Sequence, residues 1–174
     1  MIAQNNFYKK DYIVFNIKLT EVQSKDAAFI HNLMNDEIVM AALNEVPTSV
    51  FDWQCAITEW KQDLDEKDYI IFCDATPVGW IAVNGLISTD KKVFIKMVAI
   101  LPEYQGRGVG QFAVRWVIEM LRKSEYTSVA LYTDESNLKA QNCYSKCGFV
   151  VTESFVDKMS NGKSIKRYKM ELRI

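Results

Sequence analysis

VFIKMVAILPEYQGRGVGQ, the stretch Val93–Gln111, decides the fold that this sequence predicts. Its first part, Val93–Ile100, is an apolar run with a single lysine, and its β-branched residues are typical of a buried strand. Pro102 lacks a backbone donor and therefore ends the strand. Gln105–Gly110 then places a glycine at every second position, and an amphipathic helix begins at Val109. The predicted order is strand, glycine-rich loop, helix.

The glycine-rich loop has the features of an anion-binding turn. Glycine lets backbone N–H groups approach a ligand closely, because no Cβ stands in the way. The first N–H groups of a helix lack intrahelical partners and lie at the positive end of its dipole. Together these groups form a cradle for a phosphate, to which Arg107 adds a charge-assisted contact. The alternative interpretation is a tight turn that binds nothing.

Two common glycine motifs are excluded by their spacing. A nucleoside triphosphate loop requires G-x-x-x-x-G-K-[ST], and no Lys-Ser or Lys-Thr follows here. A dinucleotide fingerprint requires G-x-G-x-x-G, whereas the glycines here are Gly106, Gly108 and Gly110. The loop does match Q/R-x-x-G-x-G/A through Gln105, Gly108 and Gly110. In this it resembles the pyrophosphate loop of the GNAT superfamily of N-acetyltransferases, which bind acetyl-coenzyme A.

A second segment, ESNLKAQNCYSKCGFV, is similar to the same superfamily. On a helix that stops at Gly148, Asn137, Ala140 and Tyr144 fall on one face at i, i+3 and i+7. In the family the asparagine and the tyrosine face the cofactor, and the tyrosine often protonates the departing thiolate. The alternative interpretation of Tyr144 alone is a packing residue of an amphipathic helix, with its hydroxyl at the edge of the core.

The resemblance implies a set of site residues. Tyr144 is the expected acid, and the expected cofactor-binding residues are Met97, Val98, Ala99, Ile100, Gln105, Gly106, Arg107, Gly108, Val109, Gly110, Asn137 and Ala140. Many family members carry a glutamate base on the central strand, but here that strand offers only Lys96. Glu103 lies beside the phosphate loop and not beside the acceptor, so the base is not identified.

The periodicities of the whole chain predict one α/β domain over residues 1–174, with a mixed sheet of six or seven strands and about four helices. The central strand, its helix and the strand Thr127–Thr133 form a right-handed parallel crossover, and the resemblance implies that these two strands splay apart at the cofactor. The expected strands are Tyr12–Leu19, Tyr69–Cys73, Val78–Asn84, Val93–Ile100, Thr127–Thr133, Phe149–Phe155 and Ile165–Ile174. The expected helices are Lys25–Met34, one from Thr48 or Ser49 to about Glu66, one from Val109 to near Lys123, and Asn137–Cys147.

Composition excludes several classes of protein. At 174 residues and 49% hydrophobic content the chain is long enough for one sizeable core. The net charge of −1 gives no electrostatic case for binding nucleic acid or an anionic membrane. The four cysteines and the only histidine, His31, do not form a metal pattern, so we expect reduced thiols and no metal. Without a signal peptide or a membrane-spanning run, the expected location is the cytoplasm.

The expected function is transfer of the acetyl group of acetyl-CoA to a primary amine by direct attack, in a monomer or homodimer. The expected acceptor walls are the helices before Tyr69 and the loop Asp157–Lys163. A small amine, an antibiotic and a protein N-terminus or lysine all remain open as acceptors. Two alternatives are a domain that binds acyl-CoA as a sensor or scaffold without turnover, and an unrelated phosphate-binding α/β protein.

Overall fold

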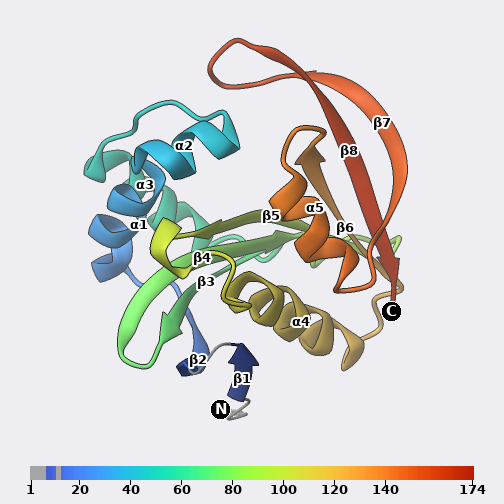
Figure 1. The fold of residues 1–174 in the computed structure, drawn as a ribbon, viewed down its shortest axis with the longest axis horizontal. Helices are drawn as coiled ribbons and strands as arrows, with labels where there is room; N and C mark the ends of the chain where they lie inside the picture. Colours follow the sequence, from blue (N-terminus) through green and yellow to red (C-terminus); the bar gives the residue numbers. More distant parts are fainter. Residues whose placement is uncertain (1–6, 11–12) are drawn as a thin grey trace.

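The computed structural model describes residues 7–10 and 13–174 and shows a twisted mixed sheet with helices on both faces (Figure 1). In chain order its strands and helices are β1 (Phe7–Lys10), β2 (Ile13–Glu21), α1 (Ala27–Met34), α2 (Glu37–Leu43), α3 (Val50–Trp60), β3 (Glu66–Cys73), β4 (Thr76–Asn84), β5 (Lys92–Ile100), α4 (Val109–Arg122), β6 (Ser128–Asp134), α5 (Leu138–Ser145), β7 (Val150–Lys158) and β8 (Ser164–Arg173). Single 3₁₀ turns precede α1 and follow β5.

The strand order is β1-β2-β3-β4-β5-β6-β8-β7. Strands β2 to β8 form the mixed sheet, and the short β1 pairs only with the first half of β2. The pair β5 and β6 is parallel and the other neighbouring pairs of described strands are antiparallel. This confirms the predicted parallel connection between the central strand and Thr127–Thr133, and the mixed α/β class. Tyr12, with which we expected β2 to begin, lies outside the described residues.

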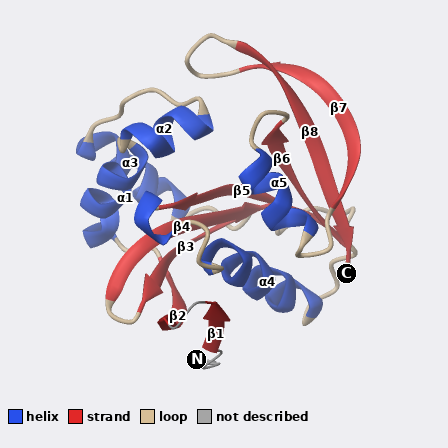
Figure 2. Cartoon of the chain, in the orientation of Figure 1, coloured by secondary structure: helices blue, strands red, loops and turns tan. Residues whose placement is uncertain are grey.

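Two hydrophobic clusters cover the two faces of the sheet. One face packs on α4 and α5 through side chains such as Val93, Ile95 and Phe112. The other packs on α1 and α3 through side chains such as Ile30 and Trp80. Figure 2 shows the helices in the same two groups, with α1, α2 and α3 gathered apart from α4 and α5. Because the sheet is buried on both faces, the sequence of its central strand is a nearly continuous apolar run.

The segment between α1 and β3 differs from the prediction. Helix α2 is not among the expected helices. The Asp36 carboxylate caps its start by accepting from the N–H groups of Ile38 and Val39 at 3.0 Å each. Helix α3 begins at the predicted Ser49 cap but ends at Trp60, so its expected extension to Glu66 is wrong. Glu66 instead opens β3, where it pairs with β4 across the sheet.

Among the described helices, none is long and apolar enough to cross a membrane. The described residues likewise contain no group of three or more His, Cys, Asp or Glu side chains that could hold a metal ion.

Candidate functional site

The candidate site lies where β5 and β6 part. Their parallel pairing runs from Lys92 opposite Ser128 to Ile95 opposite Leu131 and then stops. Beyond that point β5 continues beside β4 and β6 continues beside β8. The second half of β5, which includes the expected cofactor residues Met97 to Ile100, therefore has one edge that β6 does not cover. This opening is the splay that the resemblance implied.

A β-bulge marks the same point of β5. Ala82 pairs with Met97 and Val83 pairs with Ile95, so Lys96 is the additional residue. A bulge bends its strand and increases its twist, which turns β5 away from β6. The Lys96 ammonium donates to both carboxylate oxygens of Glu66, at 2.8 and 3.0 Å. Lys96 is thus held in an ion pair and does not take the place of the glutamate base seen in many family members.

The glycine loop leaves open space in front of the start of α4. Gly106 and Gly108 have φ angles of +71° and +85°, which L-residues adopt only with strain. A Cβ on Gly106 would meet no heavy atom within 4 Å. The first helical hydrogen bond of α4 runs from Phe112 N–H to Gly108 O, so the N–H groups of the first turn point out of the helix end. The loop therefore fits the cradle that a pyrophosphate needs.

Two other residues of the loop have defined structural contacts. The Gln105 side chain donates to the Ile100 carbonyl oxygen at 2.9 Å, and its N–H donates to Pro102 O. The Gln105 side chain thus fastens the loop to the end of β5. The backbone N–H of Gln105 is already engaged with Pro102 O. The exposed Arg107 guanidinium lies over the Tyr104 ring, 6.0 Å from its centroid, which leaves a cation at the mouth of the loop.

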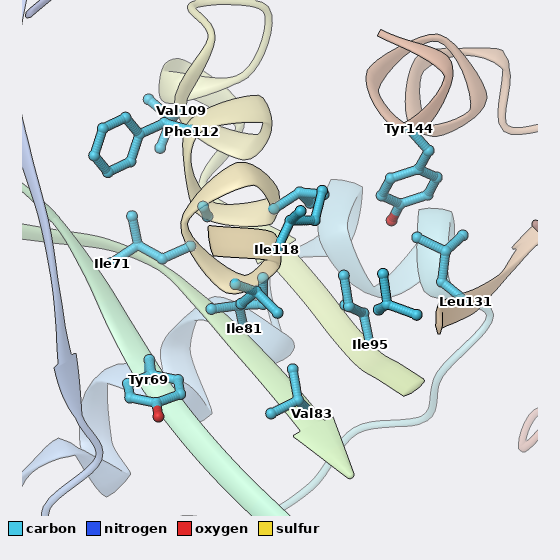
Figure 3. Close-up of a cluster of buried hydrophobic side chains, with 14 of the residues drawn as sticks. Tyr69, Ile71, Ile81, Val83, Ile95, Val109, Phe112, Ile118, Leu131 and Tyr144 are labelled. Carbon is cyan, nitrogen blue, oxygen red and sulfur yellow. The ribbon is translucent and has the colours of Figure 1, made fainter. Parts of the chain in front are cut away.

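Helix α5 positions the three residues that its spacing singled out. Asn137 caps the helix, because its side-chain oxygen accepts from Ala140 N–H at 3.1 Å. Ala140 packs against the cluster of buried residues on the α4 side of the sheet. Tyr144 is buried and its ring contacts that of Phe149. In Figure 3 its hydroxyl points from α5 toward Ile95 and Leu131, the last paired residues of the β5–β6 ladder.

Burial also sets the protonation state of Tyr144. Loss of solvent raises the pKa of its hydroxyl well above the ordinary value of 10. At neutral pH the group therefore keeps its proton. A buried, protonated hydroxyl therefore faces the end of the ladder.

On the face opposite α4, aromatic side chains that the sequence did not single out line the same opening. Phe94 alternates with Val93 and Ile95 along β5, and so projects to that face. Its ring stacks on Tyr132 of β6 at 5.8 Å between centroids, and Tyr132 meets Phe155 of β7 at 5.4 Å. The alternation of side chains along β6 could have placed Tyr132 on this face. Its contact with Phe155 of β7 could not be predicted, because it depends on how the two strands are arranged in the sheet. We call Phe94, Tyr132 and Phe155 the aromatic strip.

A polar network closes one end of the aromatic strip. Asn44, which follows α2, donates to the buried Asp134 carboxylate at 2.8 Å and accepts from the Asn161 side chain at 3.2 Å. Arg167 lies over the Tyr132 ring and pairs with Asp134 at 3.3 Å. The helices before β3 and the β7–β8 hairpin thus meet above the strip, and Figure 1 shows the hairpin turn on the side of α2.

A buried carboxylate lies nearby on the same face of the sheet. Burial raises the pKa of Asp68 to about 7, against an ordinary 3.8. One of its oxygens accepts from Trp80 Nε1 at 2.8 Å, and the other has no hydrogen-bond partner among the described residues. Trp60 and Glu66 line the same hollow. Nothing local in the sequence marks Asp68, because its environment is made by α3 and β4.

Comparison with known proteins gives a consistent result. A family model described as the acetyltransferase (GNAT) family matches residues 29–149. Spermidine N(1)-acetyltransferase of Escherichia coli K12 is 25% identical over 142 residues, which cover 78% of this chain and 74% of that protein.

Solved structures with the same fold include spermidine N-acetyltransferase of Vibrio cholerae in complex with CoA and spermine. It has a TM-score of 0.81 at 21% identity and covers 90% of this chain and 95% of that one. A dodecameric structure of spermidine N-acetyltransferase from V. cholerae has a TM-score of 0.75 at 22% identity, with 90% and 93% of the chains covered.

Proposed function

Because this chain belongs to the GNAT family of acetyltransferases and is an acetyl-CoA-dependent enzyme, we propose that it transfers the acetyl group to an amine where β5 and β6 part, with Tyr144 as the acid. The observation that carries this proposal is the direction of the Tyr144 hydroxyl, which points from α5 to the end of the parallel ladder (Figure 3). Two segments far apart in sequence, β5 and α5, thereby converge on one point.

We propose that acetyl-CoA, which supplies the thioester, is held along the uncovered edge of β5. Backbone groups of Met97 to Ile100 would pair with its pantetheine arm. The N–H groups of Gly106 to Gly110, together with Arg107, would bind its pyrophosphate. The open space in front of Gly106 supports this assignment. Asn137 and Ala140 contribute by fixing the start of α5, whose face then presents Tyr144 to the reacting atoms.

The chemistry requires three actions of the protein. A backbone N–H near Val98 or Ala99 stabilises the carbonyl oxygen as it gains charge, and one such donor contributes about 10²–10³ in rate. The amine must lose a proton before it attacks, because an ammonium group has no lone pair. The Tyr144 hydroxyl gives its proton to the sulfur as the carbon–sulfur bond breaks, and the proton released by the acetylated nitrogen restores the hydroxyl. No covalent bond to the enzyme is needed in this scheme.

The replacement Tyr144→Phe tests the scheme, because it keeps the ring and removes the proton donor. We expect acetyl-CoA affinity to change little while kcat falls roughly ten- to ten-thousand-fold, within the usual range for a general acid. Tyr126→Phe is the matched control, since the Tyr126 hydroxyl donates to the Leu86 carbonyl oxygen away from the opening. Lost affinity with kcat retained would instead make Tyr144 a binding or packing residue.

We propose that the acceptor enters from the face opposite α4, over the aromatic strip. Among primary amines, an aliphatic polyamine is the first candidate, because the relative from E. coli is a spermidine N(1)-acetyltransferase. The carboxylates near the strip are not free: Asp134 and Asp157 both pair with Arg167. A panel of polyamines, aminoglycosides and peptides with free N-termini or lysines, scored by release of CoA thiol, identifies the acceptor.

The same panel separates catalysis from a sensor or scaffold role, because a sensor would bind acetyl-CoA and release no thiol with any amine. The assembly state is a separate question. We propose a monomer or homodimer, although a relative from V. cholerae is dodecameric. Light scattering of the purified chain measures the mass directly.

A further inference from the structure

Two cysteines that the proposed function does not use lie one helical turn apart at the end of α5. Cys143 is in the last turns of the helix, and Cys147 follows its end, with its N–H donating to Tyr144 O at 2.9 Å. Both side chains are half-buried, and each thiol affects the protonation of the other. The pair therefore has solvent access, and both thiols lie at the C-terminal end of α5.

The surroundings of the two thiols favour different protonation states. The neighbouring Cys143 thiol, followed by the guanidinium of Arg115, lowers the pKa of Cys147, while the Cys147 thiol and burial raise the pKa of Cys143. Arg115 is itself fixed, because it donates to the Lys146 carbonyl oxygen at 2.9 Å. A thiolate beside an arginine is the form of cysteine that attacks disulfides.

The Cys147 thiol contacts the first turn of α4, and the Cys143 thiol faces the same turn. A Cβ on Gly110 would lie 3.6 Å from Cys143 Sγ. Cys147 Sγ lies 3.8 Å from the Gln111 carbonyl oxygen, to which its thiol donates. Gly110 is the last residue of the glycine loop and Gln111 follows it, so a change at the thiols reaches the helix end that forms the loop.

We propose that Cys143 and Cys147 form a thiol modification site, at which a low-molecular-weight disulfide such as glutathione disulfide oxidises the pair and thereby weakens the glycine loop. The Cys147 thiolate attacks one sulfur of the reagent, which leaves as a thiolate while a mixed disulfide forms. Cys143 then attacks the Cys147 sulfur and displaces the second thiolate. The two thiol protons pass to the two leaving thiolates, so one reagent disulfide is reduced to two thiols and one protein disulfide forms.

Helix geometry permits this bond but strains it. Although Cys147 follows α5, the backbone keeps helical angles through Lys146, and residues four apart on a helix have Cα atoms about 6 Å apart, inside the range of disulfides. Their Cβ atoms are about 5–6 Å apart, whereas a disulfide needs about 3.5–4.5 Å. The last turn of α5 must therefore tighten, and both sulfurs move relative to Gly110 and Gln111. A strained and accessible disulfide is also readily reduced, so the modification is reversible.

The chemical test is peptide mapping after treatment of the full chain with glutathione disulfide at neutral pH. Trypsin cuts between the two cysteines at Lys146, so the bond joins peptide 140–146 to peptide 147–158 and is seen directly by mass spectrometry. We expect this linked pair in the unaltered chain. In Cys143→Ser we expect a lasting glutathione adduct on Cys147.

Cys55, which is exposed on α3, is the internal control. Glutathione on Cys55 with residues 143 and 147 left as free thiols would overturn the proposal. In Cys55→Ser the linked pair should still form.

The functional arm compares acetyl-CoA binding by calorimetry in the oxidised and reduced chain. We expect the dissociation constant to rise about tenfold on oxidation and to recover with a reducing thiol, and Cys147→Ser should show no such change. If the disulfide between Cys143 and Cys147 forms but the affinity for acetyl-CoA is unchanged, the proposed effect of oxidation on the glycine loop is wrong. The binding measurement rests on the proposed cofactor site, whereas the peptide map does not. Failure of the disulfide proposal and failure of the proposed cofactor site can therefore be distinguished.

Discussion

Asn44 and Asp134 are joined by a side-chain hydrogen bond of 2.8 Å although they lie 90 positions apart in sequence. The bond ties the residue after α2 to the end of β6, at the border of the aromatic strip. Asn44 has a left-handed backbone, with φ of +56°, a conformation that asparagine tolerates better than most residues. Its place at the helix end is what directs the side chain across the opening.

If this contact shapes the acceptor opening, Asn44→Gly should weaken the use of the amine more than the binding of acetyl-CoA. Glycine keeps the left-handed conformation and removes the side chain, so backbone strain is not introduced. We expect KM for the amine to rise about tenfold, the effect of losing one hydrogen bond to a charged group. Asn161→Ala, which removes the outer bond of 3.2 Å to Asn44 and a bond from Lys163 N–H within the hairpin turn, should have a smaller effect. Equal losses for amine and acetyl-CoA would count against a role specific to the acceptor.

The glycine loop allows a controlled test of the cofactor site. Gly106 and Gly162 both have positive φ, at +71° and +81°, and at each a Cβ would meet nothing within 4 Å. Replacing either by valine introduces similar backbone strain, but only Gly106 lies in the proposed phosphate cradle. We expect Gly106→Val to raise the dissociation constant of acetyl-CoA by about tenfold or more, and Gly162→Val to leave it unchanged. If calorimetry gives equal values for both variants, with each folded, the assignment of the pyrophosphate to this loop fails.

Asp68 should make the stability of the protein depend on pH. Its folded pKa, about 7, is above the ordinary 3.8. Between about pH 4 and 7 the unfolded chain therefore loses the proton while the folded chain keeps it. The free energy of unfolding should fall as pH rises through this window, by up to about 4 kcal/mol.

Urea unfolding of Asp68→Asn at pH 5, 6, 7 and 8 measures this effect. The neutral amide can still accept from Trp80 Nε1, so the variant should be more stable than the unaltered chain at pH 8, with most of the difference gone at pH 5. Glu59→Gln removes an exposed carboxylate of α3 and should leave the pH dependence in place. A pH dependence that survives in Asp68→Asn would show that another group carries it.

The sequence by itself determined the central part of the fold. Val93–Ile100 is apolar because it is buried on both faces, and Pro102 and the glycines fix the turn into α4 whatever surrounds them. The cap at Asn137 likewise defines the start of α5 from a local hydrogen bond, as observed, whereas α5 ends at Ser145, before the expected stop at Gly148. Backbone conformation and the burial of one face of a helix or strand depend on a few neighbouring residues, so the sequence patterns that they require can be recognised from the sequence alone. The roles predicted for Tyr144 and the loop residues stay predictions that the experiments above test.

Only the tertiary structure decided the features that depend on residues distant in sequence. The bulge at Lys96 and its ion pair with Glu66 join β5 to β3, 30 positions earlier. The aromatic strip requires β7 to lie beside β6, and the bond from Asn44 requires α2 to meet the end of β6. Asp68 holds its proton because α3 and β4 remove water from it, and no neighbour in sequence could indicate that. Desolvation and side-chain contact depend on where the whole chain folds, whereas helices, strands and turns depend mainly on their own residues.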